Sequence, residues 1–246
     1  MPAQSTATSS APRKETPKPV RAYLFLYNLV NLAMWATCTV RGLLLLIKQT
    51  PPADNLPTIF HEVYWPLLAV TQTLAGLEVL HSLVGFVRAP VMTTFMQVAS
   101  RFLVVWGVMY PFHEGSLFVD YGEGIVGGDP IKGAKLGDYA FLGCLFSWGV
   151  TECIRYGFFA LQLGGFFVPK WWMWLRYNAF FVLYPTGISS ECALIWSSLD
   201  AAGKIHPLYR WFLIAMLVIY VPGSYILYTH MMAQRRRVLR GKSRVD

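Results

Sequence analysis

The chain has 246 residues and a formal net charge of +8, with 55% hydrophobic and 14% charged residues. An ordinary soluble domain carries about 25% charged residues, so this composition argues against a soluble globular domain, and it excludes a disordered or fibrous chain. The basic residues lie at the two chain ends and between apolar runs, not along one stripe. This distribution argues against nucleic acid as a partner and is typical of a membrane protein.

The first segment, residues 1–21, is rich in Ser, Thr, Pro and Ala and contains four basic residues. This composition is typical of a disordered basic tail, and we expect no cleavable signal peptide in it. The four cysteines of the chain all fall in apolar runs without paired spacing. We therefore expect reduced thiols, and neither disulfides nor metal ligands.

Six apolar runs follow, each long enough for the roughly 20 residues that a membrane-spanning helix needs. They are residues 22–47, 62–87, 91–112, 138–163, 172–199 and 207–232. We predict an all-α membrane protein, with six transmembrane helices in a bundle over residues 22–232 and a basic C-terminal tail over 233–246.

The segments that connect the apolar runs, and a break within one run, can also be predicted. Arg88, Ala89 and Pro90 form a tight turn between the second and third runs, since Pro favours the first position of a helix. A Gly-rich acidic loop, residues 113–137, precedes the fourth run. Pro185 and Gly187 are predicted to break the fifth run.

Orientation follows from the basic residues. With six spans both termini share one side, which then carries twelve basic residues outside the spans against four on the other side. The positive-inside rule places both termini in the cytosol and the acidic loop in the lumen or exterior.

Several charged or hydroxyl-bearing side chains lie inside the predicted spans. At 1.5 Å per residue their depths from the cytosolic end are roughly 12 to 18 Å. They are Glu78, Arg101, Glu152, Arg155 and Tyr184. A charge in hydrocarbon needs a partner or a water-filled cavity. Ion pairs that hold helices together are one interpretation. A central polar cavity that faces the cytosol is the other, and we favour it for the whole set.

The fifth run contains the pair that best fits catalysis. Tyr184 and Glu191 are seven residues apart, so on a helix they share a face, about 10.5 Å apart along the axis. A hydroxyl and a buried carboxyl are suited to acid–base chemistry. The alternative is structural: Tyr184 packs near the Pro185 break, and Glu191 pairs with Arg41, which lies at a similar depth.

The fifth run also resembles a known family. The pattern LRYNxFxxLYPxGxxxE, from Leu175 to Glu191, is similar to the fifth span of the very-long-chain (3R)-3-hydroxyacyl-CoA dehydratases, the protein-tyrosine-phosphatase-like membrane proteins. Other segments support the resemblance along most of the chain. They are Leu26-Tyr27-Asn28, GLEVLHSLVGFVRAP (Gly76–Pro90) followed by Thr94, Gln97, Ser100 and Arg101, TECIRYGFF (Thr151–Phe159) and HMMAQRRR (His230–Arg237).

Two departures from the family pattern are visible: Gly149 replaces a usual Ser, and Phe159 replaces a frequent Tyr. The resemblance implies a multi-pass enzyme of the endoplasmic reticulum membrane that acts in the fatty-acid elongation cycle. Such an enzyme would convert long- and very-long-chain (3R)-3-hydroxyacyl-CoA to trans-2-enoyl-CoA. It also implies Tyr184 and Glu191 as the catalytic pair, with Arg101, Arg176 and Gly187 in support. The phosphatase-like name does not imply phosphatase activity.

This chemistry needs one group to take the C2 proton and another to protonate the departing hydroxyl. We assign the first role to Glu191 and the second to Tyr184, and the sequence leaves the reverse open. We expect no metal and no cofactor, because coenzyme A is part of the substrate. Its phosphates would lie at the cytosolic end, near Lys170, Arg176, Arg88 and the basic residues 235–237.

Expected partners are membrane lipids, the elongase condensing enzyme, 3-ketoacyl-CoA reductase and enoyl-CoA reductase. The alternative function is a non-catalytic membrane adaptor or scaffold of the elongation complex on the same fold.

Overall fold

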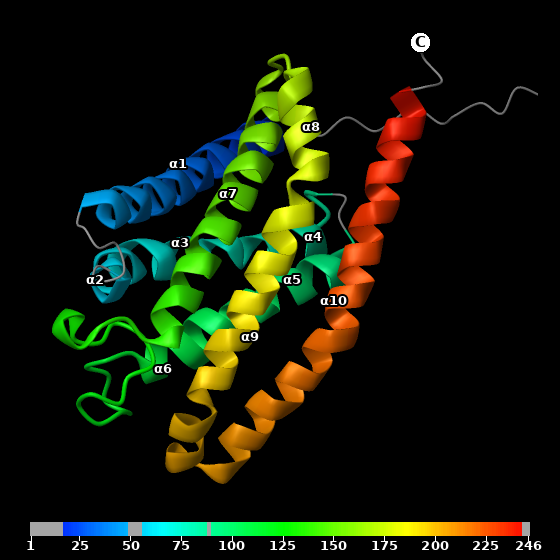
Figure 1. The fold of residues 1–246 in the computed structure, drawn as a ribbon. Coiled ribbons are helices and arrows are strands. Elements are labelled where there is room, and N and C mark those ends of the chain that lie inside the picture. Colours follow the sequence, from blue (N-terminus) through cyan, green and yellow to red (C-terminus); the bar gives the residue numbers. More distant parts are fainter. Residues whose placement is uncertain (1–16, 49–55, 88–89, 243–246) are drawn as a thin grey trace, which may run out of the picture.

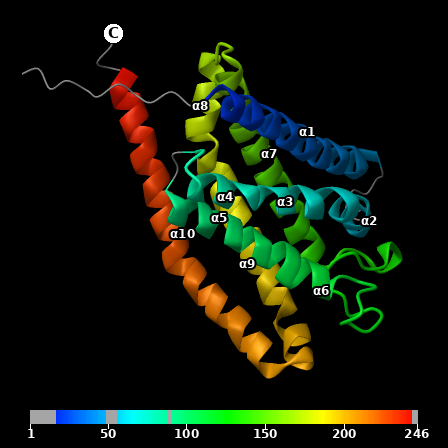
Figure 2. The same cartoon turned by 180° about the vertical axis from the view of Figure 1, so that it is seen from behind.

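A computed structural model describes residues 17–48, 56–87 and 90–242. Over these residues the chain is mainly helical, apart from the loop that contains most of residues 113–135, and its only strand-like feature is an isolated bridge between His113 and Val126. The elements appear in Figures 1 and 2. They are α1 (Lys18–Lys48), α2 (Leu56–Val63), η2 (Tyr64–Leu68), α3 (Ala69–Ala75), α4 (Leu77–Leu83), α5 (Val91–Val104), η3 (Val105–Met109), α6 (Tyr110–Phe112), η4 (Pro130–Lys132), α7 (Leu136–Gly164), α8 (Lys170–Asn178), α9 (Phe180–Ile205) and α10 (Pro207–Lys242). The all-α prediction is therefore confirmed.

The helix boundaries follow local chemistry. α7 begins where the Asp138 carboxylate accepts hydrogen bonds from the backbone N–H groups of Lys135, at 2.8 Å, and of Gly127, at 2.7 Å. This carboxylate satisfies backbone donors at the helix start and complements the helix dipole. α7 ends at Gly165, whose φ of 79° lies in the left-handed region that favours glycine. α10 starts at Pro207, a residue suited to the first position of a helix.

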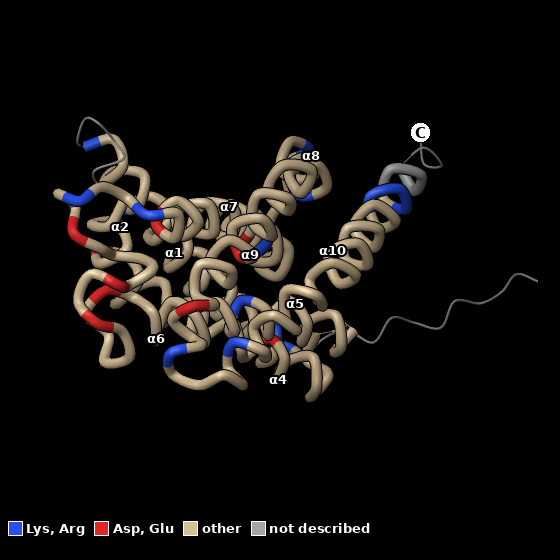
Figure 3. Tube along the Cα trace, turned by 60° about the horizontal axis from the view of Figure 1, so that its bottom comes forward, with Lys and Arg blue, Asp and Glu red and all other residues tan. Residues whose placement is uncertain are grey.

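The chain alternates between two ends of the molecule. At one end, Arg21 near the start of α1 donates a hydrogen bond to the Leu163 carbonyl at the end of α7, at 2.7 Å. Near the same end, late in α10, Arg235 donates to the Asn178 side chain of α8, at 3.1 Å. The basic band near the end of α10 lies far from the acidic segments beside α2 and α6 (Figure 3). The helical path therefore starts and finishes at one end of the molecule (Figure 1).

Three helices are long and apolar enough to cross a membrane, as far as the described residues show: Lys18–Lys48, Val91–Phe112 and Pro207–Val238. The bent pair α8 and α9 adds a fourth if it counts as one span. The other two predicted spans, 62–87 and 138–163, are not among them. The predicted disordered tail, residues 1–21, extends too far, because α1 already begins at Lys18. Residues 1–16 lie outside the described part of the chain. α10 continues to Lys242, well past the predicted end of the sixth span.

Two predicted details are wrong. The second span is not one continuous helix: it is divided into α2, η2, α3 and α4, and it ends at Leu83. Trp65, the residue before a proline, has an extended backbone (φ −82°, ψ 152°) that kinks the chain there, because proline disfavours the helical conformation in the residue that precedes it. The fifth run bends by 40° at Ala179, whereas α9 continues through Pro185 and Gly187.

Small residues let the central helices approach closely. α1 crosses α7 where a Cβ on Gly149 would collide with the Thr39 side chain, and α9 crosses α7 where a Cβ on Gly187 would lie 3.0 Å from the Ser147 hydroxyl oxygen. Such contacts between small residues are a usual means of packing helices in membranes. They give a physical reason for Gly149, which departs from the family pattern, and for Gly187.

Candidate active site

A cavity of about 350 Å³ lies between α5, α7, α9 and α10, with α3 and α4 closing one side. Its volume is at the lower end of the range for small-molecule sites. Its walls contain most of the residues predicted from the sequence: Glu78, Arg101, Glu152, Arg155, Tyr184, Gly187 and Glu191. Residues from four of the predicted spans thus meet in one place, as their matched depths indicated.

The Glu191 carboxylate is buried and held by two donors on different helices. The Trp148 indole N–H of α7 donates to Oε1 at 2.9 Å, and the Tyr220 hydroxyl of α10 donates to Oε2 at 2.7 Å. Each oxygen has a further lone pair, so the carboxylate is fixed in orientation and still able to accept a proton. The predicted alternative partner is wrong, because Arg41 instead pairs with Glu62.

Tyr184 is also anchored to α10. Its hydroxyl donates a hydrogen bond to the Ser224 carbonyl oxygen at 3.0 Å. Tyr220 and Ser224 are four residues apart, so one face of α10 holds both Tyr184 and Glu191. Since α9 is continuous through Pro185, the two side chains keep the two-turn separation expected on a helix. Both side chains line the cavity.

The other charged side chains that line the cavity form one network. Glu152 of α7 accepts from both Arg101 of α5 and Arg155 of α7. Arg155 also donates two hydrogen bonds to Glu78 of α4, at 2.5 and 2.7 Å, and the Tyr156 hydroxyl donates to the same carboxylate at 2.5 Å. The paired charges balance, so this network joins three helices and also forms a polar wall of the cavity.

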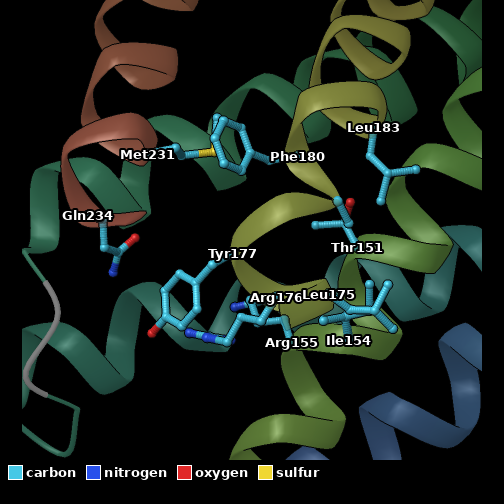
Figure 4. Close-up of a pocket in the computed structure, with 11 residues that line it drawn as sticks. Thr151, Ile154, Arg155, Leu175, Arg176, Tyr177, Phe180, Leu183, Met231 and Gln234 are labelled. Atoms are coloured by element: carbon cyan, nitrogen blue, oxygen red, sulfur yellow. The ribbon is translucent and has the colours of Figure 1, made fainter. Parts of the chain in front are cut away.

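Arg176 lies in a second, smaller cavity of about 150 Å³, between α7, α8, α9 and the late part of α10 (Figure 4). Its guanidinium stacks on the rings of Phe158, at 4.3 Å, and Phe159, at 4.8 Å, from the ring centres. It has no carboxylate partner among the side chains that the structure describes, so its charge is available to an anion. Arg155 and Phe180 line both cavities, which are therefore neighbours.

The remaining predicted residues lie elsewhere. Lys170 is exposed at the start of α8 and lines neither cavity. Arg88 lies outside the described residues. Trp148, Tyr220 and Ser224 were not predicted from the sequence, where their only signals are polar atoms within apolar runs. No three His, Cys, Asp or Glu side chains gather as a metal site within the described ranges.

The chain resembles known proteins over most of its length. Residues 72–241 match the family described as protein tyrosine phosphatase-like protein, PTPLA. A Schizosaccharomyces pombe relative, named probable very-long-chain (3R)-3-hydroxyacyl-CoA dehydratase, is 39% identical and aligns with 88% of this chain and 92% of its own. The Arabidopsis thaliana dehydratase PASTICCINO 2 is 35% identical, over 89% of this chain and 93% of its own. The Caenorhabditis elegans dehydratase hpo-8 is 33% identical, over 92% of this chain and 98% of its own. No solved structure matches this chain.

Proposed function

This chain belongs to the protein tyrosine phosphatase-like (PTPLA) family, and we propose that it is a hydro-lyase that dehydrates long- and very-long-chain (3R)-3-hydroxyacyl-CoA to trans-2-enoyl-CoA. The names of the relatives support this activity. The observation that carries it is that Tyr184 and the buried, doubly hydrogen-bonded carboxylate of Glu191 line the same cavity.

In the proposed reaction the C2–C3 segment of the substrate lies between Tyr184 and Glu191. Glu191 takes the proton from C2, and the electron pair of that C–H bond forms the new double bond to C3. The C3–O bond breaks as Tyr184 donates its proton, so water leaves. Transfer of the proton from Glu191 to Tyr184 then restores both groups. The reverse assignment of acid and base gives the same product.

The two donors to Glu191 are part of this proposal. A carboxylate that must meet a C–H bond needs a fixed direction, because misplacement by about 1 Å can cost about 100-fold in rate. Trp148 and Tyr220 give the carboxylate that direction from two different helices.

The coenzyme A head would bind near the second cavity. Arg176 has a guanidinium free of carboxylate partners there, and Arg235 lies close by, bonded to Asn178. Phosphates bind such guanidinium groups well. Because the two cavities adjoin, the head can occupy one while the thioester and C3 reach the other.

We also infer six membrane crossings, with both termini in the cytosol and the protein in the endoplasmic reticulum membrane. The argument is the asymmetry of twelve basic residues against four and the return of the helical path to one end of the molecule. The substrate is the product of a 3-ketoacyl-CoA reduction, and its product is used by an enoyl-CoA reduction. The condensing enzyme and both reductases of elongation are therefore the proposed partners.

The direct test is incubation of the purified protein with a long-chain (3R)-3-hydroxyacyl-CoA, followed by mass spectrometry. We expect an enoyl-CoA that has lost one water molecule. A protein that binds the substrate and yields no enoyl-CoA would instead be the non-catalytic adaptor of the elongation complex.

A further inference from the structure

We propose that the acyl chain of the substrate leaves the cavity sideways, through an opening between α5 and α10, and extends into the surrounding lipid. This inference rests on the proposed function, and it assigns a binding path to the part of the substrate that takes no part in the chemistry.

The first observation is where the cavity reaches the surface. Phe95 and Met96 of α5 and Ile219 of α10 line the cavity, yet they are 53%, 37% and 54% exposed. Side chains on the opposite wall, such as Gln72 and Trp148, are buried. The cavity is therefore closed behind the ion network and open between these two helices. These three exposed side chains are apolar, and the neighbouring exposed side chain of the rim, Gln97 of α5, is polar.

The second observation is how α10 is held. Near its start, the Tyr209 hydroxyl donates to the Gly107 carbonyl of η3, which closes the gap at that level. Further along, Tyr220 and Ser224 bond residues of α9. Gly223 lines the cavity between them, and a Cβ there would find nothing within 4 Å. The space beside this part of α10 is therefore unfilled.

The third consideration is where a long chain can go. Ordinary acyl chains fill half of a hydrocarbon core about 30 Å thick, so an extended very long acyl chain is at least about 15 Å long. The cavity wall behind the ion network is buried at Gln72 and Trp148, so we place the continuation of the chain at the open side. The exposed side chains there are mainly apolar, and the chain can pass them into lipid without exposing its methylene groups to water.

The polar and apolar ends of the substrate then leave in different directions. The second cavity, with Arg176, lies toward the basic end of α8 and α10. The opening between α5 and α10 lies beside the catalytic pair. A substrate in this arrangement keeps its coenzyme A head in water and its chain in lipid while C2 and C3 lie between Tyr184 and Glu191.

The test narrows the opening from either wall. Ile219→Trp and Met96→Trp each add bulk at the rim. Val218→Trp is the matched control, because Val218 is 65% exposed on the same helix and does not line the cavity. Turnover of 3-hydroxyoctanoyl-CoA and 3-hydroxyeicosanoyl-CoA is measured for each purified variant and for the unaltered protein.

We expect both rim variants to lower kcat/KM for the long substrate relative to the short one by about tenfold, as for the loss of about two methylene contacts. The control should keep the ratio of the unaltered protein. Equal effects on both chain lengths, or no effect, would overturn the proposed path.

A second measurement does not depend on turnover. A long 3-hydroxyacyl-CoA with a photoreactive diazirine at the end of its chain should label peptides from α5 and α10. Labelling confined to α1 or α3 would contradict the path. If the unaltered protein dehydrates neither substrate, the proposed function fails, and the labelling pattern still decides where the chain lies.

Discussion

Replacing Glu152 by Gln should destabilise the protein strongly, because this carboxylate is the centre of the ion network. The Glu152 side chain is 3% exposed and lies between Arg101 and Arg155. Arg155 keeps Glu78 as a partner in the variant. Arg101, with a side chain 18% exposed, keeps no carboxylate partner among the described residues. Leaving one member of a buried pair uncompensated costs about 3–5 kcal/mol.

The assay is thermal unfolding of the protein in detergent. For a chain of this size, about 1 kcal/mol lowers Tm by about 2–4 °C, so even the smaller cost gives a fall of about 6–12 °C. The control is Glu123→Gln, which removes the exposed partner of Lys204 and should leave Tm close to that of the unaltered protein, since exposed pairs contribute little. Equal and small shifts in both variants would refute the network as a structural element.

Three further predictions concern the site and its orientation. Tyr220→Phe removes one donor to Glu191 and should lower kcat by about 10- to 100-fold with little change in KM, as a hydrogen bond to a charged group contributes about 1.5–3 kcal/mol; an unchanged kcat would show that the donor is dispensable. Arg176→Ala should raise KM for the acyl-CoA and weaken inhibition by free coenzyme A, whereas an unchanged KM would remove Arg176 from the head site. Glycosylation tags at residue 1 and after residue 246 should stay unmodified in microsomes, with a tag in the 113–137 loop modified; a modified C-terminal tag contradicts six crossings.

The sequence predicted much of the helical framework because long apolar runs need little tertiary information. It misplaced the bend of the fifth run. The helix tolerates Pro185, and proline within helices is common in membranes, where neighbouring groups satisfy the freed carbonyl. The actual bend at Ala179 has no glycine or proline to mark it. The kink at Trp65 was readable, since a proline follows that residue.

The site was predictable to the extent that depth along a helix decides it. The estimated depths of Glu78, Arg101 and Glu152 in their spans are similar, and in the structure all three line one cavity. Depth does not say which faces of different helices meet. The donors Trp148 and Tyr220 therefore stayed unrecognised, and Arg41 was matched to Glu191 when its partner is Glu62.

The central claim is that Tyr184 and Glu191 act as one acid–base unit, and one set of variants tests it most directly. Turnover of a long-chain 3-hydroxyacyl-CoA and Tm are measured on the same samples of Tyr184→Phe, Glu191→Gln and the double variant. We expect each single variant to lose about 10²–10⁴-fold in turnover while staying folded, and the double variant to be hardly worse, because groups that act as a unit are not additive. Near-normal turnover in either single variant would contradict the claim.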